Sequence, residues 1–332
     1  MVAVLVVGGA GYVGAHACKA LASNGYQPVV YDNLSTGHRS FVRWGELIEG
    51  DIRNAASVAD AIERSGAEAV LHFAACACVR ESMEDPAKYY QQNLAGTLSL
   101  LEGMRFSRCN KLVFSSTCAV YGNAVSGSIS EATPPMPVSP YGRSKWMVEQ
   151  VISDYAAAYG LEAIRLRYFN ASGADEAAEI GEDHSPETHL IPSALATLRR
   201  PNSGFTVFGT DFDTPDGTAI RDYIHVADLA DAHVTALEAV MGGHSGVYNL
   251  GTGCGHSVQE VLRTIAEVTG RDVPAAYAGR RMGEPAALVA DAALAWKRLG
   301  FQPTRSVLPE IVRTAWAWHE RLSARALAGA LT

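Results

Sequence analysis

Tyr141 and Lys145 are separated by three residues in "SPYGRSKWMVEQ", a segment with the composition of a helix start. Side chains four positions apart share one face of a helix, so the phenol and the ammonium group would be neighbours. A tyrosine titrates near ~10 in water, which is too high for a base at neutral pH. A nearby ammonium group would lower this pKa by stabilising the phenolate. The pair predicts a tyrosine that exchanges a proton with a substrate, although many pairs with this spacing are only surface residues.

A second pattern with chemical meaning is the glycine-rich stretch "GGAGYVG", in which Gly9, Gly11 and Gly14 fit G-x-G-x-x-G. Glycines let the backbone approach a pyrophosphate at the positive end of the following helix. Asp32 ends the next apolar run, where a carboxylate binds the ribose hydroxyls of adenosine and repels a 2′-phosphate. Taken alone, Asp32 could equally be a turn residue of "YDNLSTG". Together these residues predict NAD rather than NADP, and the absence of a G-x-x-x-x-G-K-[ST] loop disfavours an NTPase.

Two other groups of residues could bind a metal, but both are interpreted as structural. Cys76 and Cys78 have a spacing that suits a zinc site poorly, and no second pair completes one. We interpret them as small residues of the core or of a pocket. In the second group Asp228 is expected to open an amphipathic helix, and the group comprises His225, Asp228, Asp231 and His233. No metal is therefore expected.

Apolar runs and helical stretches alternate along the first half of the chain. Strands alternating with helices form a parallel, doubly wound sheet that is covered on both faces. We therefore expect an α/β fold with a Rossmann-type sheet and a smaller C-terminal α/β lobe. The expected strands are residues 1–7, 27–32, 69–74, 111–117 and 162–170, and the expected helices are 12–25, 89–106 and 140–160.

The pattern loosens after Asn170 into a polar stretch with glycine and proline, followed by short strands and helices. We expect residues 1–170 to form the dinucleotide-binding domain and residues 171–332 to form mainly the substrate lobe. The chain is expected to return to the first domain around residues 220–250.

Composition excludes several classes of partner. The 332 residues are 48% hydrophobic and 19% charged with a net charge of −8, which is typical of a globular protein without a nucleic-acid or anionic-membrane surface. The N-terminal run "VAVLVV" is too short for a signal sequence or a membrane span. Six cysteines are scattered without the spacing of a disulfide framework, which favours the reducing cytoplasm.

The order of the motifs resembles one known family. The chain contains in succession "GGAGYVG", "YDNLSTGHR", "EGDIR", "HFAA", "FSSTCAVYG", "SPYGRSK", "RYFNASGA", "DGTAIRDYIHVADLADAH" and "YNLGTG". This succession resembles the extended short-chain dehydrogenase/reductases and, more narrowly, the UDP-glucose 4-epimerases. The resemblance extends from the first expected strand to about Asp291. The segments "RYFNASGA" and "RDYIHVADLADAH" are the most specific to nucleotide-sugar epimerases.

The resemblance implies a catalytic role for three residues. Tyr141 would take the proton of the sugar 4-hydroxyl while NAD removes the hydride from C4. Lys145 would hold the nicotinamide ribose and tune Tyr141, and Thr117 would hydrogen-bond the reacting hydroxyl. The 4-keto sugar would then turn on its diphosphate before the hydride returns to the other face. Because nothing is oxidised overall, NAD would stay tightly bound and would not be consumed.

The resemblance also implies two sets of binding residues. Two arginines of the second set suit a diphosphate, which needs forked cationic donors. The residues expected at NAD are Gly8, Gly11, Tyr12, Val13, Gly14, Asp32, Asn33, Leu34, Ser35, Asp51, Ile52, Phe73, Ala74, Ala75, Ala77, Gln92, Ser115, Tyr141, Lys145 and Phe169. The residues expected at the UDP-sugar are Thr117, Cys118, Ala119, Tyr141, Asn170, His189, Leu190, Thr206, Val207, Phe208, Arg221, Arg281 and Glu284.

The residues after Thr117 distinguish reaction types within this superfamily. Dehydratases carry carboxylates there and decarboxylases keep a glutamate, whereas this chain has Cys118 and Ala119. Oxidation and re-reduction at C4 needs no such acid. The resemblance therefore favours an epimerase over enzymes that eliminate water or carbon dioxide.

Departures from the hexose epimerase pattern leave the sugar open. Ala77 stands where many relatives carry a lysine, Arg80 where glycine is frequent, and His189 where asparagine is common. Leu288 has an intermediate size at a position that tunes pocket width for N-acetylated sugars. The segment "FAACACVRES" also resembles relatives that act on UDP-xylose and UDP-arabinose. We expect UDP-glucose/UDP-galactose first and UDP-xylose/UDP-arabinose second.

The sequence disfavours two other functional classes. A non-catalytic NAD(P)-binding regulator typically loses the tyrosine or the lysine, and this chain keeps Tyr141 and Lys145. A net nucleotide-sugar oxidoreductase must exchange its cofactor and often prefers NADP, which Asp32 disfavours. A homodimer is expected because relatives pair through helices that match residues 92–106 and 142–158.

Overall fold

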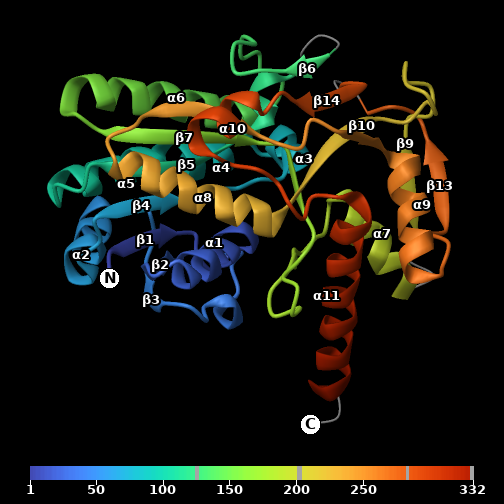
Figure 1. Ribbon diagram of the computed structural model, residues 1–332, viewed down its shortest axis with the longest axis horizontal. Helices are drawn as coiled ribbons and strands as arrows, with labels where there is room; N and C mark the ends of the chain where they lie inside the picture. The colour runs from blue at the N-terminus through green and yellow to red at the C-terminus, as the bar shows by residue number, and fades with distance from the viewer. Residues whose placement is uncertain (124–126, 200–203, 282–283, 330–332) are drawn as a thin grey trace.

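Seven parallel strands form the main sheet, in the order β11-β7-β5-β4-β1-β2-β3 (Figure 1). The computed structural model describes residues 1–123, 127–199, 204–281 and 284–329. The strand order reverses between β1 and β4, and doubly wound folds bind ligands at such a switch point. The α/β class expected from the sequence is confirmed. The strands are β1 (Ala3–Val7), β2 (Gln27–Asp32), β3 (Glu46–Glu49), β4 (Ala69–His72), β5 (Lys111–Thr117), β7 (Glu162–Tyr168) and β11 (Gly246–Leu250).

Helices cover both faces of the main sheet, which explains why its inner strands are apolar along their length. All five residues of β1 are buried, as are all four of β4. One face packs against α1 (Tyr12–Ser23), α8 (Val226–Met241) and α10 (Ala293–Leu299). The other face packs against α2 (Ala55–Ser65), α5 (Gly96–Phe106) and α6 (Pro140–Tyr159).

A second, smaller set of strands and helices lies at one end of the main sheet (Figure 1). Its principal strands follow the order β12-β10-β14-β6, with β8 paired to β10, and β13 and β9 form a separate pair. Helices α7, α9 and α11 share an apolar core with β9 and β10. The bounds are β6 (Ser128–Ile129), β8 (Asn170–Ser172), β9 (Phe205–Phe208), β10 (Ile220–His225), β12 (Gly255–Ser257), β13 (Ala275–Ala278), β14 (Ala287–Ala290), α7 (Leu190–Arg199), α9 (Val258–Thr269) and α11 (Leu308–Gly329).

The strand expected over residues 162–170 is divided in two. β7 stays in the main sheet, whereas β8 pairs with β10 in parallel. Phe169 lies between them, so the chain passes from the main sheet to the smaller set of strands at this residue. The prediction was wrong here because an apolar run does not reveal a change of partner strand.

The helix expected over residues 89–106 is also interrupted. The chain forms α3 (Val79–Glu84), α4 (Pro86–Tyr89) and a π-helical turn, η2 (Tyr90–Ala95), before α5 begins. In η2 the Asn93 side chain accepts from Cys76 N at 2.8 Å and donates to Cys76 O at 3.0 Å. Wide π turns of this kind occur frequently at functional sites.

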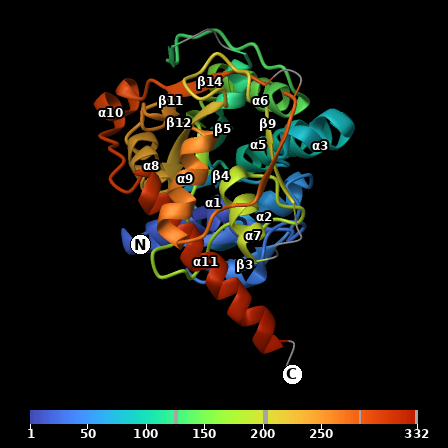
Figure 2. The same cartoon turned by 90° about the vertical axis from the view of Figure 1, so that its right-hand side faces the viewer.

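The last helix, α11, extends away from the rest of the molecule toward the C-terminus (Figure 2). Across the described ranges, no helix combines the length and the apolar composition that crossing a membrane requires.

Within residues 226–250, α8 packs on one face of the main sheet and β11 is an edge strand of that sheet. The division into two domains at residue 170 stays a prediction.

Candidate active site

A cleft of about 660 Å³ lies at the carboxyl ends of the main-sheet strands. Residues that follow β1, β2, β4, β5 and β7 all line it, and β10 contributes from the smaller set of strands. Parallel strands end on the same edge, so motifs far apart in sequence meet in this cleft. The cleft therefore contains the glycine turn, the Tyr–Lys pair and the residues after Phe169 together.

The glycine turn forms a backbone cradle between β1 and α1. Gly8 has φ +82°, and a Cβ there would lie 2.5 Å from Ala74 N. A Cβ on Gly14 would lie 2.2 Å from Gly8 O, so neither position admits a side chain. α1 begins after Gly11 without a side-chain cap, which leaves its first backbone N–H groups free for an anion. This cradle fits the pyrophosphate of a dinucleotide.

Asp32 lies at the end of β2, buried at the edge of the cleft. Its Oδ2 accepts from Ala10 N at 3.0 Å and its Oδ1 accepts from Leu34 N at 2.8 Å. Burial raises the pKa of Asp32, and these two backbone hydrogen bonds oppose the rise. Each carboxylate oxygen can accept a second hydrogen bond, so Asp32 can hold the turn and also bind ribose hydroxyls.

Two other expected NAD residues lie just behind the cleft wall. Leu34 and Asp51 do not line the cleft, whereas Asn33 and Ile52 beside them do. Asp51 accepts from Asn33 Nδ2 at 3.2 Å and forms a salt bridge with Arg53 at 2.7 Å. Hydrogen bonding from Arg53 lowers the pKa of Asp51 to about 2. Asp51 thus positions Asn33, which contacts the cleft directly.

Lys145 is fully enclosed where α6 packs on β5. Its Nζ donates to Ser115 O at 2.8 Å and lies 4.8 Å from the centre of the Phe114 ring. Burial lowers the pKa of Lys145 to about 7. Pro140 and the Ser139 cap fix the start of α6, since Ser139 Oγ accepts from Gly142 N at 3.1 Å. The lysine is therefore held in one orientation toward the cleft.

Tyr141 and Thr117 line the cleft beside Lys145. Burial raises the pKa of Tyr141 above the usual tyrosine range, the neighbouring Tyr168 adds to the rise, and the Thr117 hydroxyl opposes it. Desolvation of the phenol opposes the lower pKa that the Tyr–Lys spacing predicts with a positively charged nicotinamide nearby, and the lower value stays a prediction. The Lys145 ammonium group itself donates to Ser115 O.

A buried ionic network links the strand that ends in Thr117 with the helix that carries Tyr141. Glu149 on α6 accepts from Ser116 Oγ at 2.5 Å and from Arg167 Nη2 at 2.6 Å. Arg167 also donates to the Tyr121 hydroxyl at 3.0 Å, and this hydroxyl donates to Asn249 Oδ1 at 2.6 Å. The network ties α6 to β5, β7 and β11, so it fixes the spacing of the catalytic candidates.

The expected UDP-sugar residues fall into two groups. The first lines the cleft and comprises Thr117, Cys118, Ala119, Tyr141, Asn170, His189, Leu190 and Arg221. The second lies outside the cleft lining and comprises Thr206, Val207, Phe208, Arg281 and Glu284. The two groups are connected, because Arg221 forms a salt bridge with Glu284 at 3.2 Å. The Arg281 guanidinium lies 3.9 Å from the centre of the Phe208 ring.

The histidines and acids of "DYIHVADLADAH" make structural contacts. His225, not Asp228, caps α8, because its Nδ1 accepts from Ala227 N at 3.1 Å. Asp228 lies in the first turn and accepts from Arg305 N at 2.8 Å and Ser306 Oγ at 2.6 Å. The prediction of Asp228 as the first capping residue is therefore wrong. A carboxylate three residues into the helix also suits the positive end of the dipole.

The "CAC" segment, residues 76–78, runs from the cleft wall to the start of α3. Cys76 and Ala77 line the cleft, and Cys78 precedes α3 and is also a free thiol. Burial raises the pKa of the Cys76 thiol, which keeps it neutral. Among the described cations that line the cleft, Lys88 of α4 is the nearest in sequence to position 77, where many relatives carry a lysine, because Arg80 does not line the cleft.

Several cleft residues were not predicted from the sequence. They include Lys88, Tyr168 and the pair Glu182 and His184. Tyr168 lies within the segment "RYFNASGA", although no role was predicted for it, and it hydrogen-bonds Ser115 Oγ through its hydroxyl. The sequence "GEDHSPETHL" contained a signal for the acidic and histidine residues, because it concentrates carboxylates and imidazoles within eight positions.

Comparisons with known proteins agree with this geometry. Residues 4–251 match the family model described as "NAD dependent epimerase/dehydratase family". The UDP-glucose 4-epimerase of Rhizobium leguminosarum bv. trifolii is 50% identical over 319 residues, which cover 96% of this chain and 97% of that protein.

Two solved structures are similar over nearly their whole length. UDP-glucose 4-epimerase from Brucella ovis in complex with NAD is 52% identical with a TM-score of 0.93, covering 96% of this chain and 98% of that one. UDP-glucose-4-epimerase from Stenotrophomonas maltophila, with bound NAD and formylated UDP-arabinopyranose, is 38% identical with a TM-score of 0.95, covering 98% and 100%. The chain belongs to the NAD dependent epimerase/dehydratase family and, within it, to the UDP-glucose 4-epimerase family.

Proposed function

We propose that this protein inverts C4 of a UDP-sugar by NAD-dependent oxidation and re-reduction, with UDP-glucose and UDP-galactose as the preferred pair. The observation that carries the proposal is the grouping of Thr117, Tyr141 and Lys145 on one wall of a cleft that also contains the glycine cradle. The relatives named UDP-glucose 4-epimerase support the same reaction.

Each of the three residues has a distinct task. NAD, when bound, supplies a hydride acceptor and donor. Tyr141 takes the proton from the 4-hydroxyl and returns it after the sugar has turned. Thr117 hydrogen-bonds the reacting oxygen from the end of β5. Lys145, fixed by Ser115 O, holds the cofactor ribose and adds positive charge beside the phenol.

The carboxylates of the cleft support epimerisation over elimination. Among the described residues that line the cleft, only Asp32 and Glu182 are acidic. Asp32 ends β2 and holds the turn after β1, and Glu182 follows β8 in the smaller set of strands and helices. Cys118 and Ala119, directly after Thr117, cannot supply the acid and base that removal of water requires.

A UDP-pentose is the second candidate substrate. Ala77 lines the cleft and carries no charge, whereas hexose epimerases often have a lysine at this position. A structurally similar epimerase was solved with formylated UDP-arabinopyranose, which gives this alternative a second support. Leu288 also lines the cleft and is intermediate in size between the tyrosine and the smaller residues that tune pocket width for N-acetylated sugars.

A side-by-side assay separates these substrates. One preparation is given UDP-galactose, UDP-xylose and UDP-N-acetylglucosamine at equal concentration, and kcat/KM is compared. The proposal predicts the highest value for UDP-galactose. A higher value for UDP-xylose would assign the protein to the pentose reaction, and Ala77→Lys would then be expected to shift the ratio toward UDP-galactose.

We also propose a homodimer formed through α5 and α6. Leu98 and Phe106 on α5 and Met147 and Tyr159 on α6 are exposed apolar side chains. An apolar surface shared by neighbouring helices favours association. Light scattering should give a dimer mass for the parent and a monomer mass for Leu98→Glu/Met147→Glu. The matched control is Leu294→Glu, which alters an exposed leucine on α10.

A cytoplasmic location is proposed on the basis of the cysteines. All six are free thiols, and Cys18 and Cys109 are buried in the core. Thiols stay reduced in the cytoplasm. Cell fractionation with an antibody to the protein tests this proposal, and recovery from an oxidising compartment would contradict it.

A further inference from the structure

Two glutamates and two histidines converge on the segment between β8 and α7. They are Glu182, His184, Glu187 and His189, and one ligand atom of each lies within 4.8 Å of the others. The segment "GEDHSPETHL" thus folds back on itself so that these four side chains meet. Glu182, His184 and His189 all line the cleft, and Glu182 is the most buried of the three.

The distances between these atoms approach those of a tetrahedral site. His184 Nδ1 lies 3.3 Å from Glu182 Oε1 and 3.7 Å from Glu187 Oε2. His189 Nδ1 lies 3.3 Å from Glu187 Oε1 and 2.5 Å from Glu182 Oε1. Ligands about 2.0–2.1 Å from a tetrahedral zinc lie about 3.3 Å from one another. For all four to reach one ion, the His189–Glu182 pair has to open and the pairs that are up to 4.8 Å apart have to close.

The donor set selects a class of metal. Two imidazole nitrogens with two carboxylate oxygens suit zinc and neighbouring transition metals, whereas Mg²⁺ and Ca²⁺ prefer oxygen ligands alone. A divalent ion with two carboxylates and two neutral imidazoles carries no net charge, so it can be held at the cleft wall. We propose that Glu182, His184, Glu187 and His189 form a binding site for a zinc-type divalent cation.

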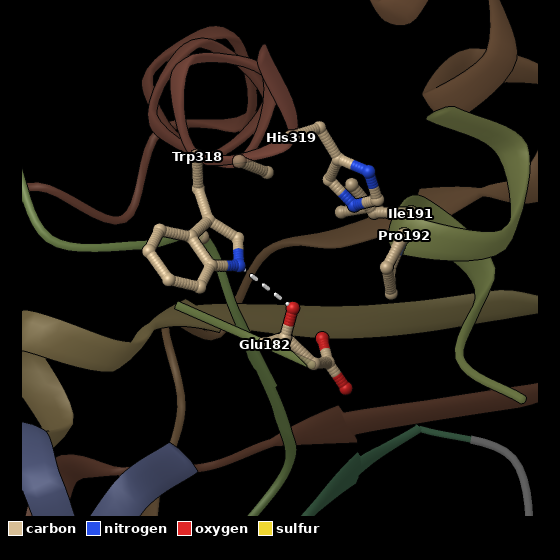
Figure 3. Close-up of a pocket in the computed structure, with 7 residues that line it drawn as sticks. Glu182, Ile191, Pro192, Trp318 and His319 are labelled. Carbon is tan, nitrogen blue, oxygen red and sulfur yellow. Dashed lines mark hydrogen bonds between the residues drawn. The ribbon is translucent and has the colours of Figure 1, made fainter. Parts of the chain in front are cut away.

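The surroundings hold Glu182 rigidly, as a metal ligand requires. Figure 3 shows Trp318 and His319 of α11 above Glu182, and Trp318 Nε1 donates to the Glu182 carbonyl at 2.9 Å. His319 is only 7% exposed, and its Nε2 has no hydrogen-bond partner within the described part of the chain. It lines, with Glu182, a cavity of about 10 Å³, which has room for about one water. The unpartnered His319 Nε2 therefore belongs to a ring that shares a small cavity with Glu182.

The same four side chains can also be held together by protons. Each histidine forms salt bridges with both glutamates if its ring is protonated. Zinc would replace these protons without a large change in the path of the chain. The consequence concerns the cleft, because His189 and its neighbour Leu190 lie on the wall that we assign to the UDP-sugar. The site itself does not depend on the proposed reaction.

Zinc stoichiometry tests the site directly. The full-length protein is stripped with a chelator, its thiols are blocked with iodoacetamide, and Zn²⁺ is added by isothermal titration, with Mg²⁺ as a comparison. We expect one zinc per chain, no Mg²⁺ binding, and a rise of a few degrees in Tm at saturating zinc. His184→Gln and Glu187→Gln should each weaken zinc binding by at least about 100-fold. Loss of a group that only hydrogen-bonds a ligand costs less than this.

The control variant is His244→Gln, which alters an exposed histidine after α8 and should bind zinc like the parent. Circular dichroism of each variant establishes that the fold is kept, so that lost binding reports a lost ligand. Absence of stoichiometric zinc in the parent would overturn the proposal, as would equal zinc binding by the parent, His184→Gln and Glu187→Gln. Zinc that disappears only when thiols are blocked would also overturn it, since cysteines would then be the ligands.

Discussion

At the scale of single residues, the site depends on how burial alters ordinary side chains. Burial raises the pKa of the Tyr141 phenol, and the positive charge of a bound nicotinamide together with the Lys145 ammonium group would lower it so that the phenolate can take the proton of the 4-hydroxyl. Lys145 is a desolvated amine with a pKa of about 7. A proton exchanger and a cation of adjustable charge therefore lie on the same wall of the cleft, beside the Thr117 hydroxyl.

Removal of the Tyr141 hydroxyl tests its role as the proton exchanger. Tyr141→Phe should lower kcat by about 100- to 10,000-fold, which is the usual contribution of a general acid–base group. The fold and the retained NAD should be unchanged, because the ring still fills its place. Steady-state kinetics and the nucleotide content of the purified protein check this. Tyr277→Phe, at an exposed tyrosine of β13, is the control, and near-parental kcat for Tyr141→Phe would exclude the assigned role.

At the scale of elements, the turn between β1 and α1 leaves no room for side chains. In Gly14→Ala the new Cβ would lie 2.2 Å from Gly8 O, and a backbone atom cannot move aside cheaply. The turn should therefore open and the protein should lose most of its bound NAD. Gly279→Ala meets no atom within 4 Å and serves as the control. The measurement is NAD per chain after gel filtration, and full retention by Gly14→Ala would show that the cradle does not bind the dinucleotide.

The packing of α6 on β5 depends on the buried Glu149–Arg167 pair. Glu149→Gln leaves the Arg167 charge without its partner, which costs about 3–5 kcal/mol of unfolding free energy. Because the pair connects the elements that carry Tyr141 and Thr117, kcat should fall more than KM changes. Urea unfolding and kinetics measure the two effects. Glu84→Gln removes the exposed partner of Arg80 and should change little, so equal effects of the two variants would contradict the positioning role.

At the scale of the whole molecule, four buried histidines should make stability sensitive to acid. Burial lowers the pKa of His72 to about 3 and those of His16, His225 and His233 to about 4. Each unfolded histidine titrates near ~6.5, so below this pH the unfolded state binds more protons and stability falls as the pH drops toward 4.

The expected slope is on the order of 1 kcal/mol per histidine for each pH unit between about 6.5 and 4.5. Urea unfolding at several pH values measures the slope. His233→Gln removes one titrating group and should reduce the slope while lowering stability at pH 7. Stability that is independent of pH over this window would contradict the account.

The local parts of the fold and the site were predictable from the sequence. The buried strand β1 is a continuous apolar run, and the glycine turn and the Tyr–Lys pair are short patterns with their own chemistry. The Asp32 side chain also lies where its position after β2 predicts.

Features that depend on distant contacts were not predictable. Phe169 marks a change of partner strand that only the pairing of β8 with β10 reveals. Arg281 and Phe208 contact each other outside the cleft lining, although both were expected at the substrate. The burial that raises the pKa of Tyr141 was also not predicted, because helix spacing gives neighbours but not desolvation.

The central claim is that the cleft epimerises a UDP-sugar at C4 with NAD that is not consumed. The most direct test is to give the purified protein UDP-galactose without added nucleotide and to follow the sugar by NMR. The account predicts conversion to UDP-glucose until equilibrium, with many turnovers for each bound NAD. No conversion, or turnover that requires NADPH in proportion to product, would contradict it.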